Sequence, residues 1–401
     1  MKKCTIRDID LAGKRVLLRV DYNVQVDERG IVDDHRLRES LPTLQALREA
    51  GAKVAICSHR GRPRGQVSEA LRNAPVARHL SELLSHPVAV ARDCIGPEAR
   101  AAVEELGPGD MVLLENVRFY AEEEANDEDF ARELASLADV YVNDAFGTAH
   151  RAHASIVGIP KFLPAVAGLL LEREVDYLTK VTVNPERPLG LVFGGAKMSD
   201  KLPILDHLSD HADVICVGGG MANTFLKAQG VDVQDSLVED NQMDAAREVM
   251  RRAEARGNPK IVLPVDVVVS FGAPDSGGIT IAPVDQVPSG WRILDIGPRT
   301  VEAFAQALDG VRTAVWNGPM GMFEQERFAG GSMAMARVLA LLSATTVAGG
   351  GETAAVIHRA GVSSRISHVS TGGGASLAML AGQPLPGVEA LQDRVEAVVR
   401  S

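Results

Sequence analysis

The residues best suited to chemistry in this chain are two lysines in a glycine loop. Residues 193–201 read Phe-Gly-Gly-Ala-Lys-Met-Ser-Asp-Lys, which places Lys197 and Lys201 after a pair of glycines. Glycines let backbone amides approach a ligand closely, and lysines add compact positive charge, so the segment favours an anion such as phosphate. The spacing is not that of a Walker A loop. Two solvated lysines at an ordinary helix start remain an alternative.

The flanking residues predict the elements that hold this loop. The apolar run Leu189–Phe193 is typical of a buried strand, and leucines spaced at helical period from residue 202 to residue 208 predict a helix. We expect Ser199 or Asp200 to cap that helix and Pro203 to lie in its first turn. The order strand, glycine loop, helix is the usual setting of an anion site.

Further glycine groups follow other predicted strands of the second half, at residues 218–220, 349–351 and 372–374. Each alone is weak, because tight turns and close packing also use glycine. Their shared position predicts a nucleotide site with contributions from Gly195, Gly219, Gly351 and the adjacent Thr353.

Two carboxylates of the second half are candidates within this site. Glu352 follows a glycine group, where it would be an oxygen ligand for phosphate-bound Mg2+ or simply a helix N-terminal acid favoured by the dipole. Glu324 follows the loop that starts at Trp316 and Asn317, where it would accept ribose hydroxyls or be an exposed loop carboxylate.

The first half alternates predicted strands and helices. Strands are predicted at residues 15–20, Lys53–Cys57, 111–115 and Val140–Asn143, with helices from about residue 37 and over residues 76–84. This alternation predicts a parallel sheet covered by helices, whose ligands bind beyond the carboxyl ends of the strands.

Basic side chains collect in the segments that follow these strands. We define the basic rim as the five residues Arg36, His59, Arg62, Arg118 and Arg151, with Arg36 expected just before its helix. Arginines bind carboxylate and phosphate bidentately, which suits a small phosphorylated acid. The alternative is a set of surface arginines paired with acids such as Glu115 or Asp144.

Other polar residues near the rim have weaker interpretations. Asp21 and Asn23 would receive substrate hydroxyls or cap a local turn. His150 and His153 show no third metal ligand, so a metal site there is not expected. The acidic run of residues 122–124 is expected to be solvated, with only Glu122 close enough to orient Arg118.

Composition and charge exclude several classes of protein. The 401 residues exceed one usual core, and the net charge of -11 disfavours binding to nucleic acid. The most apolar run, residues 163–171, contains a proline and is too short to span a bilayer. Four separated cysteines without a Cys-x-x-Cys pair, and no apolar core after the first lysines, predict reduced thiols in the cytoplasm.

The predicted fold class is α/β, with two similar-sized Rossmann-like lobes that each contain a mostly parallel sheet covered by helices. The lobes are expected at residues 1–168 and 188–384, with a linker helix and hinge at 169–187 and a cleft between the lobes. An acid on one lobe and a nucleotide on the other predict a phosphotransferase. A carboxylate acceptor is already ionised at neutral pH and needs no general base.

The ordered motifs of this chain resemble those of the phosphoglycerate kinase family along nearly its whole length. They stand at residues 19–24, 58–63, 114–119, 143–151, 194–201, 218–222, 316–321 and 370–376. The resemblance implies a monomeric enzyme of glycolysis that closes about a hinge. Its reaction would be reversible phosphoryl transfer from 1,3-bisphosphoglycerate to MgADP, giving 3-phosphoglycerate and MgATP.

The resemblance also implies roles for individual residues. The phosphoglycerate would be bound by Asp21, Asn23, Arg36, His59, Arg62, Arg118 and Arg151, with Arg36 also near the transferring group. Lys197 would stabilise that group in flight, Lys201 would hold nucleotide phosphate, and Asn317 and Glu324 would lie along the nucleotide. Gly373 would offer a helix-terminal amide, and residues 385–401 would return to the first lobe.

Three positions depart from the family pattern. Glu352 replaces the usual aspartate, which keeps the oxygen ligand but adds a methylene, while Arg60 replaces an apolar residue and Asn223 an aromatic one. A kinase for another small acid and a non-catalytic nucleotide-binding module remain alternatives, although a nucleotide sensor alone would need neither the basic rim nor Lys197.

Overall fold

The computed structural model describes residues 2–273 and 276–394 and divides into two compact units. Unit 1 contains the chain up to Asp176 and again from Pro384, and unit 2 extends from Tyr177 to Gln383. The division falls inside helix α6 (Leu169–Val183), which joins the two units in sequence. Of the predicted C-terminal return, residues 385–394 belong to unit 1, and residues 395–401 lie outside the described residues.

Unit 1 is built on a six-stranded parallel sheet of order β5-β6-β4-β1-β7-β8. Its strands are β1 (Arg15–Arg19), β4 (Lys53–Cys57), β5 (Val88–Val90), β6 (Met111–Leu113), β7 (Val140–Asn143) and β8 (Ala165–Ala167). A small antiparallel hairpin, β2 (Val26–Asp27) with β3 (Gly30–Ile31), stands apart from this sheet. The sequence analysis did not predict the short strands β5 and β8.

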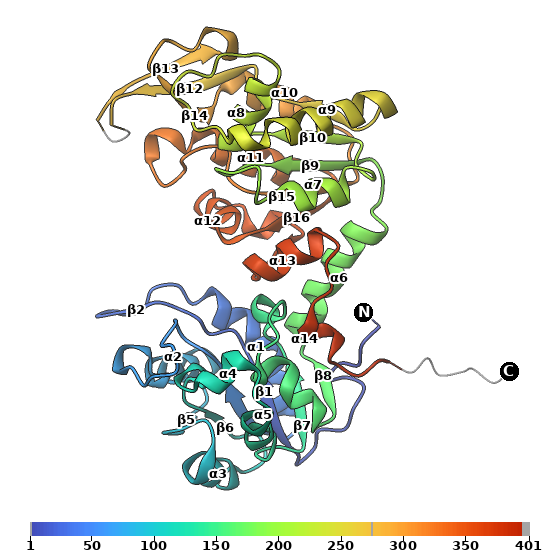
Figure 1. Ribbon diagram of the computed structural model, residues 1–401. Helices are drawn as coiled ribbons and strands as arrows, with labels where there is room; N and C mark the ends of the chain where they lie inside the picture. Colours follow the sequence, from blue (N-terminus) through green and yellow to red (C-terminus); the bar gives the residue numbers. More distant parts are fainter. Residues whose placement is uncertain (1, 274–275, 395–401) are drawn as a thin grey trace, which may run out of the picture. The chain divides into compact units, whose positions relative to one another are not determined.

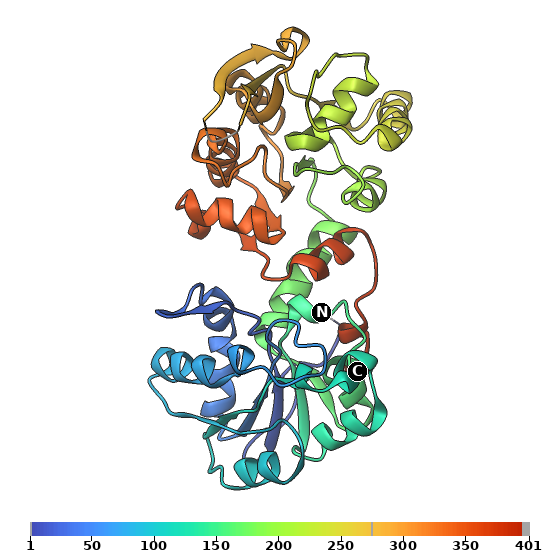
Figure 2. The same cartoon turned by 60° about the vertical axis from the view of Figure 1, so that its left-hand side comes forward.

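Helices cover both faces of this sheet (Figures 1 and 2). They are α1 (His35–Glu49), α2 (Ala74–Leu84), α3 (Gly96–Glu104), α4 (Ala121–Ala125), α5 (Glu128–Ala135) and α14 (Pro386–Glu389). Helix α1 begins before the predicted start, so Arg36 lies in its first turn and not ahead of it.

Alternation along β1 decides which side chains face which layer. Val16 and Leu18 join the apolar cluster with α1 and α2. Because side chains of a strand alternate between the faces of a sheet, Arg19 points to the other face. There it meets Ser155 of the π-helical turn η4 (Ala154–Gly158).

Unit 2 contains a second parallel sheet of order β11-β10-β9-β15-β16-β17. Its strands are β9 (Leu189–Phe193), β10 (Val214–Val217), β11 (Lys260–Val262), β15 (Thr313–Asn317), β16 (Thr345–Gly349) and β17 (His368–Val369). An additional antiparallel sheet, which the sequence did not predict, has the order β13-β12-β14 and consists of β12 (Asp266–Phe271), β13 (Gly278–Pro283) and β14 (Arg292–Ile296).

The helices of unit 2 follow its strands and pack on its sheet. They are α7 (Leu202–Leu208), α8 (Gly219–Ala228), α9 (Met243–Arg256), α10 (Pro298–Ala307), α11 (Gly330–Leu341), α12 (Gly351–Arg359) and α13 (Gly373–Leu380). Three of them, α8, α12 and α13, start within the predicted glycine groups. The two α/β units with parallel sheets confirm the predicted fold class.

The start of α7 corrects one prediction. Lys201 is the N-cap residue of this helix and makes no side-chain capping bond, whereas Ser199 is engaged elsewhere and Asp200 precedes the cap. Pro203 lies in the first turn, as expected.

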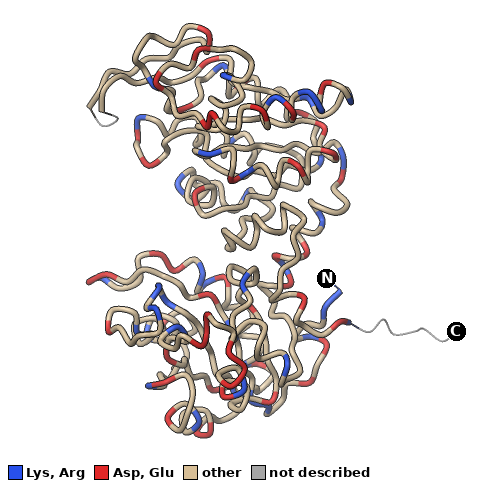
Figure 3. Tube along the Cα trace, viewed as in Figure 1, with Lys and Arg blue, Asp and Glu red and all other residues tan. Residues whose placement is uncertain are grey.

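Positions of basic and acidic residues are interspersed along the backbone of each unit (Figure 3). The basic rim is therefore a local concentration within an acidic chain. Within the described residues, no helix combines the length and the apolar character needed to cross a membrane.

Candidate active site

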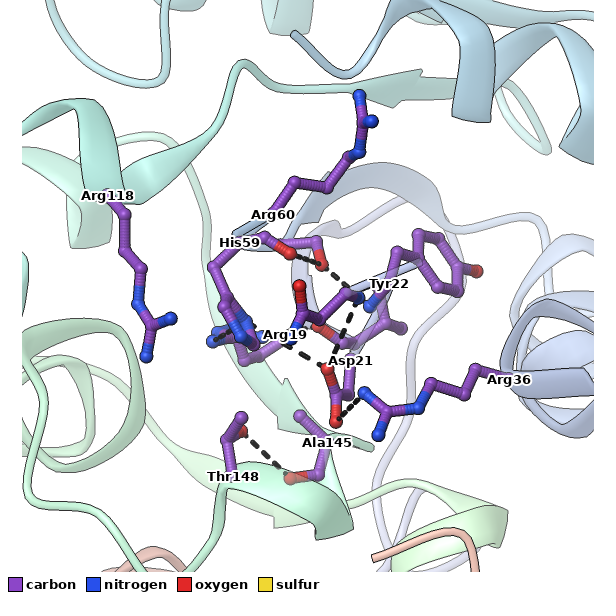
Figure 4. Close-up of polar contacts among 12 residues, drawn as sticks. Arg19, Asp21, Tyr22, Arg36, His59, Arg60, Arg118, Ala145 and Thr148 are labelled. Atoms are coloured by element: carbon purple, nitrogen blue, oxygen red, sulfur yellow. Dashed lines mark hydrogen bonds and ion pairs between the residues drawn. The ribbon is translucent and has the colours of Figure 1, made fainter. Parts of the chain in front are cut away.

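The carboxyl ends of β1 and β4 are neighbours, and this pairing assembles the first part of the basic rim (Figure 4). Asp21 follows β1, His59 follows β4, and Arg36 comes from the first turn of α1. Arg36 Nη1 donates to Asp21 Oδ2 at 2.8 Å, and Asp21 Oδ1 lies 3.9 Å from His59 Nδ1. Asp21 thus holds one rim cation and lies beside another rim residue.

Asn23 and Arg118 bind opposite sides of one loop residue. Gly61 N donates to Asn23 Oδ1 at 2.8 Å, and Arg118 Nη1 donates to Gly61 O at 2.9 Å. Gly61 has a φ of 59°, and a Cβ there would come within 2.8 Å of Leu71 Cδ2, so the position requires glycine. These two bonds link the segments after β1, β4 and β6.

Arg118 is the most deeply buried arginine of the basic rim, with only 3% of its side chain exposed. Burial lowers the pKa of its guanidinium, and Nη2 is buried with no hydrogen-bond partner. Its Nε lies 3.2 Å from Glu124, so the expectation that Glu122 orients it was wrong. A buried guanidinium nitrogen without a partner is a donor available to an anion.

The remaining rim residues are less enclosed. Arg62 is exposed on the loop after Gly61, and Arg151 is half-buried, with its Nε donating to His150 Nε2 at 3.4 Å. Burial, followed by the charge of Arg151, lowers the pKa of His150, while burial and neighbouring arginines lower the pKa of His153 to about 4. The described residues include no cluster of three or more acids, histidines or cysteines able to hold a metal.

His59 is neutral within this cationic setting. Its side chain is 2% exposed, and burial followed by the charges of Arg19, Arg118, Arg151 and Arg36 lowers its pKa well below the ordinary value. A protonated imidazole would repel these guanidinium groups and forgo hydration. His59 is therefore suited to act in the basic rim as a neutral hydrogen-bond donor and not as a cation.

Sequence reasoning missed Arg19 and misjudged the acidic run of residues 122–124. Arg19 ends an apolar strand and is 1% exposed, while Glu123 is fully buried and not solvated. The signal available was an arginine at the end of a hydrophobic strand. Arg60, by contrast, points away from Asp21 (Figure 4). Its guanidinium donates to the carbonyl oxygens of Ala70 and Arg72.

In unit 2 the predicted anion segment, which we call the lysine loop (residues 194–201), follows β9. Gly195 N donates to Pro319 O at 2.7 Å, and Gly195 O accepts from Met221 N at 3.0 Å. A Cβ on Gly219 would meet the backbone of Gly195 at 2.7 Å, so close packing of these loops already accounts for that glycine. The loop leaves Lys197 exposed.

Lys201, at the edge of this loop, is within electrostatic reach of the Glu352 carboxylate. Burial lowers the pKa of Lys201, while the charges of Asp200 and Glu352 oppose that effect. Glu352 is exposed in the first turn of α12, and nothing lies within 4 Å of a Cβ built on Gly351 or on Gly373. The first residues of α12 and α13 are therefore not crowded on the side where a side chain would stand.

Asn317 and Thr353 link β15 to the start of α12. Asn317 Nδ2 donates to Gly349 O at 2.6 Å, and Gly318 N donates to Thr353 Oγ1 at 2.8 Å. Asn317 Oδ1 is buried without a partner, which marks an acceptor available to a ligand. Glu324 is exposed on the loop between β15 and the 3-10 turn η8 (Glu326–Phe328).

Unit 1 gathers cations at the ends of its strands and unit 2 gathers glycine amides and lysines, a combination that defines the class of small-molecule phosphotransferases. The family profile described as "Phosphoglycerate kinase" matches residues 6–383. The chain belongs to the phosphoglycerate kinase family.

Individual relatives agree with this assignment. The chain is 54% identical to the phosphoglycerate kinase of Pelotomaculum thermopropionicum and 50% identical to that of Moorella thermoacetica, in each case over 98% of this chain and 100% of the relative. The solved phosphoglycerate kinase of Coxiella burnetii aligns with a TM-score of 0.87 at 39% identity, covering 97% of this chain and 98% of that one. The solved phosphoglycerate kinase of Pyrococcus horikoshii aligns with a TM-score of 0.85 at 35% identity, covering 97% of this chain and 98% of that one. The two alternatives, another acid kinase and a non-catalytic module, are not favoured.

Proposed function

We propose that the basic rim and the lysine loop are the two halves of a phosphoglycerate kinase active site. The reaction moves a phosphoryl group reversibly from 1,3-bisphosphoglycerate to MgADP, giving 3-phosphoglycerate and MgATP. The observation that carries the proposal is the buried, partnerless Nη2 of Arg118 within a rim of further cations. A desolvated guanidinium is retained at such a position when an anion completes its hydrogen bonds.

The rim would bind the acid. Arg62, Arg118 and Arg151 would contact its phosphate and carboxyl oxygens, while Asp21 and Asn23 would accept from its hydroxyl group. Arg36, now paired with Asp21, would turn toward the transferring phosphoryl group. No proton needs to move, because the attacking oxygen is a carboxylate in one direction and a diphosphate oxygen in the other.

The lysine loop and the helix starts of unit 2 would bind the nucleotide. Lys201, Gly195, Gly219, Gly351 and Thr353 would surround its phosphates, and Asn317 and Glu324 would lie along it. Lys197 and the Gly373 amide would face the negative charge that develops on the transferring group.

Glu352 would hold Mg2+ together with the phosphates. Its carboxylate is exposed beside an open glycine, and among the described residues no group of three or more acids, histidines or cysteines could hold a metal. A metal carried mainly by the nucleotide fits this donor set. The ion would neutralise phosphate charge during transfer.

We further propose that the enzyme works as a cytoplasmic monomer that closes about a hinge when both substrates bind. Its four cysteines are free thiols, which suits a reducing compartment. Solution scattering should show a smaller radius of gyration with both substrates than with either alone, and an unchanged radius would contradict closure.

A coupled assay with ATP and 3-phosphoglycerate tests the function. Activity should require the phosphate of the acid, so glycerate and acetate should give none. Replacing Mg2+ with Mn2+ tests Glu352, and Glu352→Ala should raise the metal concentration needed for half activity. Equal rates with unphosphorylated acids would refute the assignment of the rim.

A further inference from the structure

A chain of buried hydrogen bonds runs from the basic rim into unit 1. Glu123 accepts at Oε1 from Ser155 Oγ at 2.6 Å and at Oε2 from Ser155 N at 2.8 Å. Ser155 Oγ accepts from Arg19 Nε at 2.8 Å, and Arg19 Nη2 lies 3.3 Å from His59 Nδ1. Arg19 Nη1 also donates to the carbonyl of Val20. The rim histidine is therefore connected to a buried carboxylate through an arginine and a serine.

The chemistry of these groups determines where the protons are. Ser155 Oγ receives the Arg19 N–H, so its own proton is given to Glu123. A guanidinium has no acceptor, so the contact between Arg19 and His59 is a hydrogen bond only if Nδ1 accepts. A neutral imidazole whose Nδ1 accepts carries its proton on Nε2.

Two further observations agree with a proton on Nε2 of His59. Asp21 Oδ1, the acceptor that would favour a proton on Nδ1, is 3.9 Å away and beyond hydrogen-bond distance. The hydrogen-bond contact that Arg19 makes with the His59 ring is at Nδ1 and not at Nε2. The N–H group that these hydrogen bonds place on His59 Nε2 is therefore available to donate to a bound ligand.

We propose that Glu123, Ser155 and Arg19 are positioning residues that hold His59 as its Nε2–H tautomer and so present a fixed neutral donor to the acidic substrate. Only the substrate contact rests on the proposed function. Without these hydrogen bonds, the His59 proton would be on Nδ1 and would point to Asp21. Nε2 of His59 would then present a lone pair to the substrate anion.

The tautomer can be measured directly by 15N NMR on protein labelled at histidine, with His59 signals identified by their loss in His59→Gln. In the unmodified protein we expect an unprotonated Nδ1 and a protonated Nε2. The opposite pattern, or protonation of both nitrogens at neutral pH, overturns the proposal without any other variant.

Ser155→Ala then tests the connection, because it removes the hydroxyl and keeps both charges. We expect His59 to become a mixture of tautomers and the KM for 3-phosphoglycerate to rise about 5- to 10-fold, with kcat and the KM for ATP within about twofold. Tyr141→Phe is the matched control, since Tyr141 donates to the carbonyl of the same Ser155 at 2.8 Å and lies outside the chain.

The possible results separate the two parts of the proposal. An unchanged His59 tautomer in folded Ser155→Ala overturns the positioning role. A changed tautomer with an unchanged KM overturns the contact between His59 and substrate, and with it that part of the proposed function, while the tautomer assignment stands. If the His59 tautomer changes as much in Tyr141→Phe as in Ser155→Ala, the positioning role is also overturned.

Discussion

The Glu239 carboxylate holds the lysine loop by accepting two hydrogen bonds from Ser199. The backbone N of Ser199 donates at 3.0 Å and its Oγ donates at 2.6 Å. The backbone N of Glu239 in turn donates to Thr224 Oγ1 of α8 at 3.1 Å. A carboxylate from a distant segment therefore anchors the loop that carries Lys197. Charge-assisted bonds of this kind are about twice as strong as neutral ones.

Glu239→Gln should loosen this anchor. One amide oxygen cannot replace two carboxylate acceptors, so we expect kcat to fall about 3- to 10-fold and the free energy of unfolding to drop by ~1 kcal/mol. Steady-state kinetics and urea unfolding measure the two effects. Ser199→Ala, which keeps the backbone bond, should be milder. Unchanged kcat in both variants would show that the anchor has no role in catalysis.

Lys197→Ala should lower kcat by ~10² or more with little change in the KM for ATP, because a cation facing the transferring group acts mainly in the transition state. Initial rates at saturating substrates provide the measurement. Lys227→Ala is a suitable control, since Lys227 forms a surface ion pair with Asp240 at 2.7 Å. A kcat equal to that of the control would remove Lys197 from the catalytic groups.

Arg62→Lys should raise the KM for 3-phosphoglycerate by about tenfold and leave the KM for ATP unchanged. Lysine keeps the charge but cannot form the bidentate contact of a guanidinium. Arg64→Lys on the same exposed loop serves as the control and should behave as the unmodified enzyme. A change confined to the KM for ATP would contradict the assignment of the acid to unit 1.

Because Asp295 is buried in unit 2, we expect the free energy of unfolding to depend on pH. Its carboxylate accepts from Gly331 N at 2.7 Å and Ile296 N at 2.9 Å, yet burial raises its pKa to about 7 from an ordinary value of 3.8. The folded state therefore retains a proton that the unfolded state loses. This contribution to stability is complete below pH ~4 and is lost as the pH rises toward ~7.

Asp295→Asn should remove this contribution. Over pH 4–7 the free energy of unfolding of the unmodified protein should decline relative to that of the variant by up to ~1.4 kcal/mol per pH unit. Denaturant titrations followed by tryptophan fluorescence suit the test, because the two tryptophans, Trp291 and Trp316, both lie in unit 2. Asp309→Asn, at an exposed position, is the control, and parallel pH profiles for all three proteins would contradict the prediction.

The sequence alone determined the strands and the segments that follow them. Apolar runs such as Leu189–Phe193 and Val140–Asn143 have the bounds expected of them, since a buried strand needs contiguous hydrophobic residues. Glycines and cations after such strands indicated where anions bind, because the carboxyl ends of parallel strands share one edge. Local pattern was sufficient for the fold class, and the family followed from the resemblance of the ordered motifs.

Only the tertiary structure decided which polar residues are buried and what they bind. Glu123 looked solvated because its partner Ser155 is 32 residues away, and Ser155 in turn binds Arg19 from 136 residues away. A charged side chain can be buried only when such partners meet it, and no local pattern records them. For the same reason the structure, and not the sequence, assigned Ser199 to Glu239 and left His59 neutral beside four arginines.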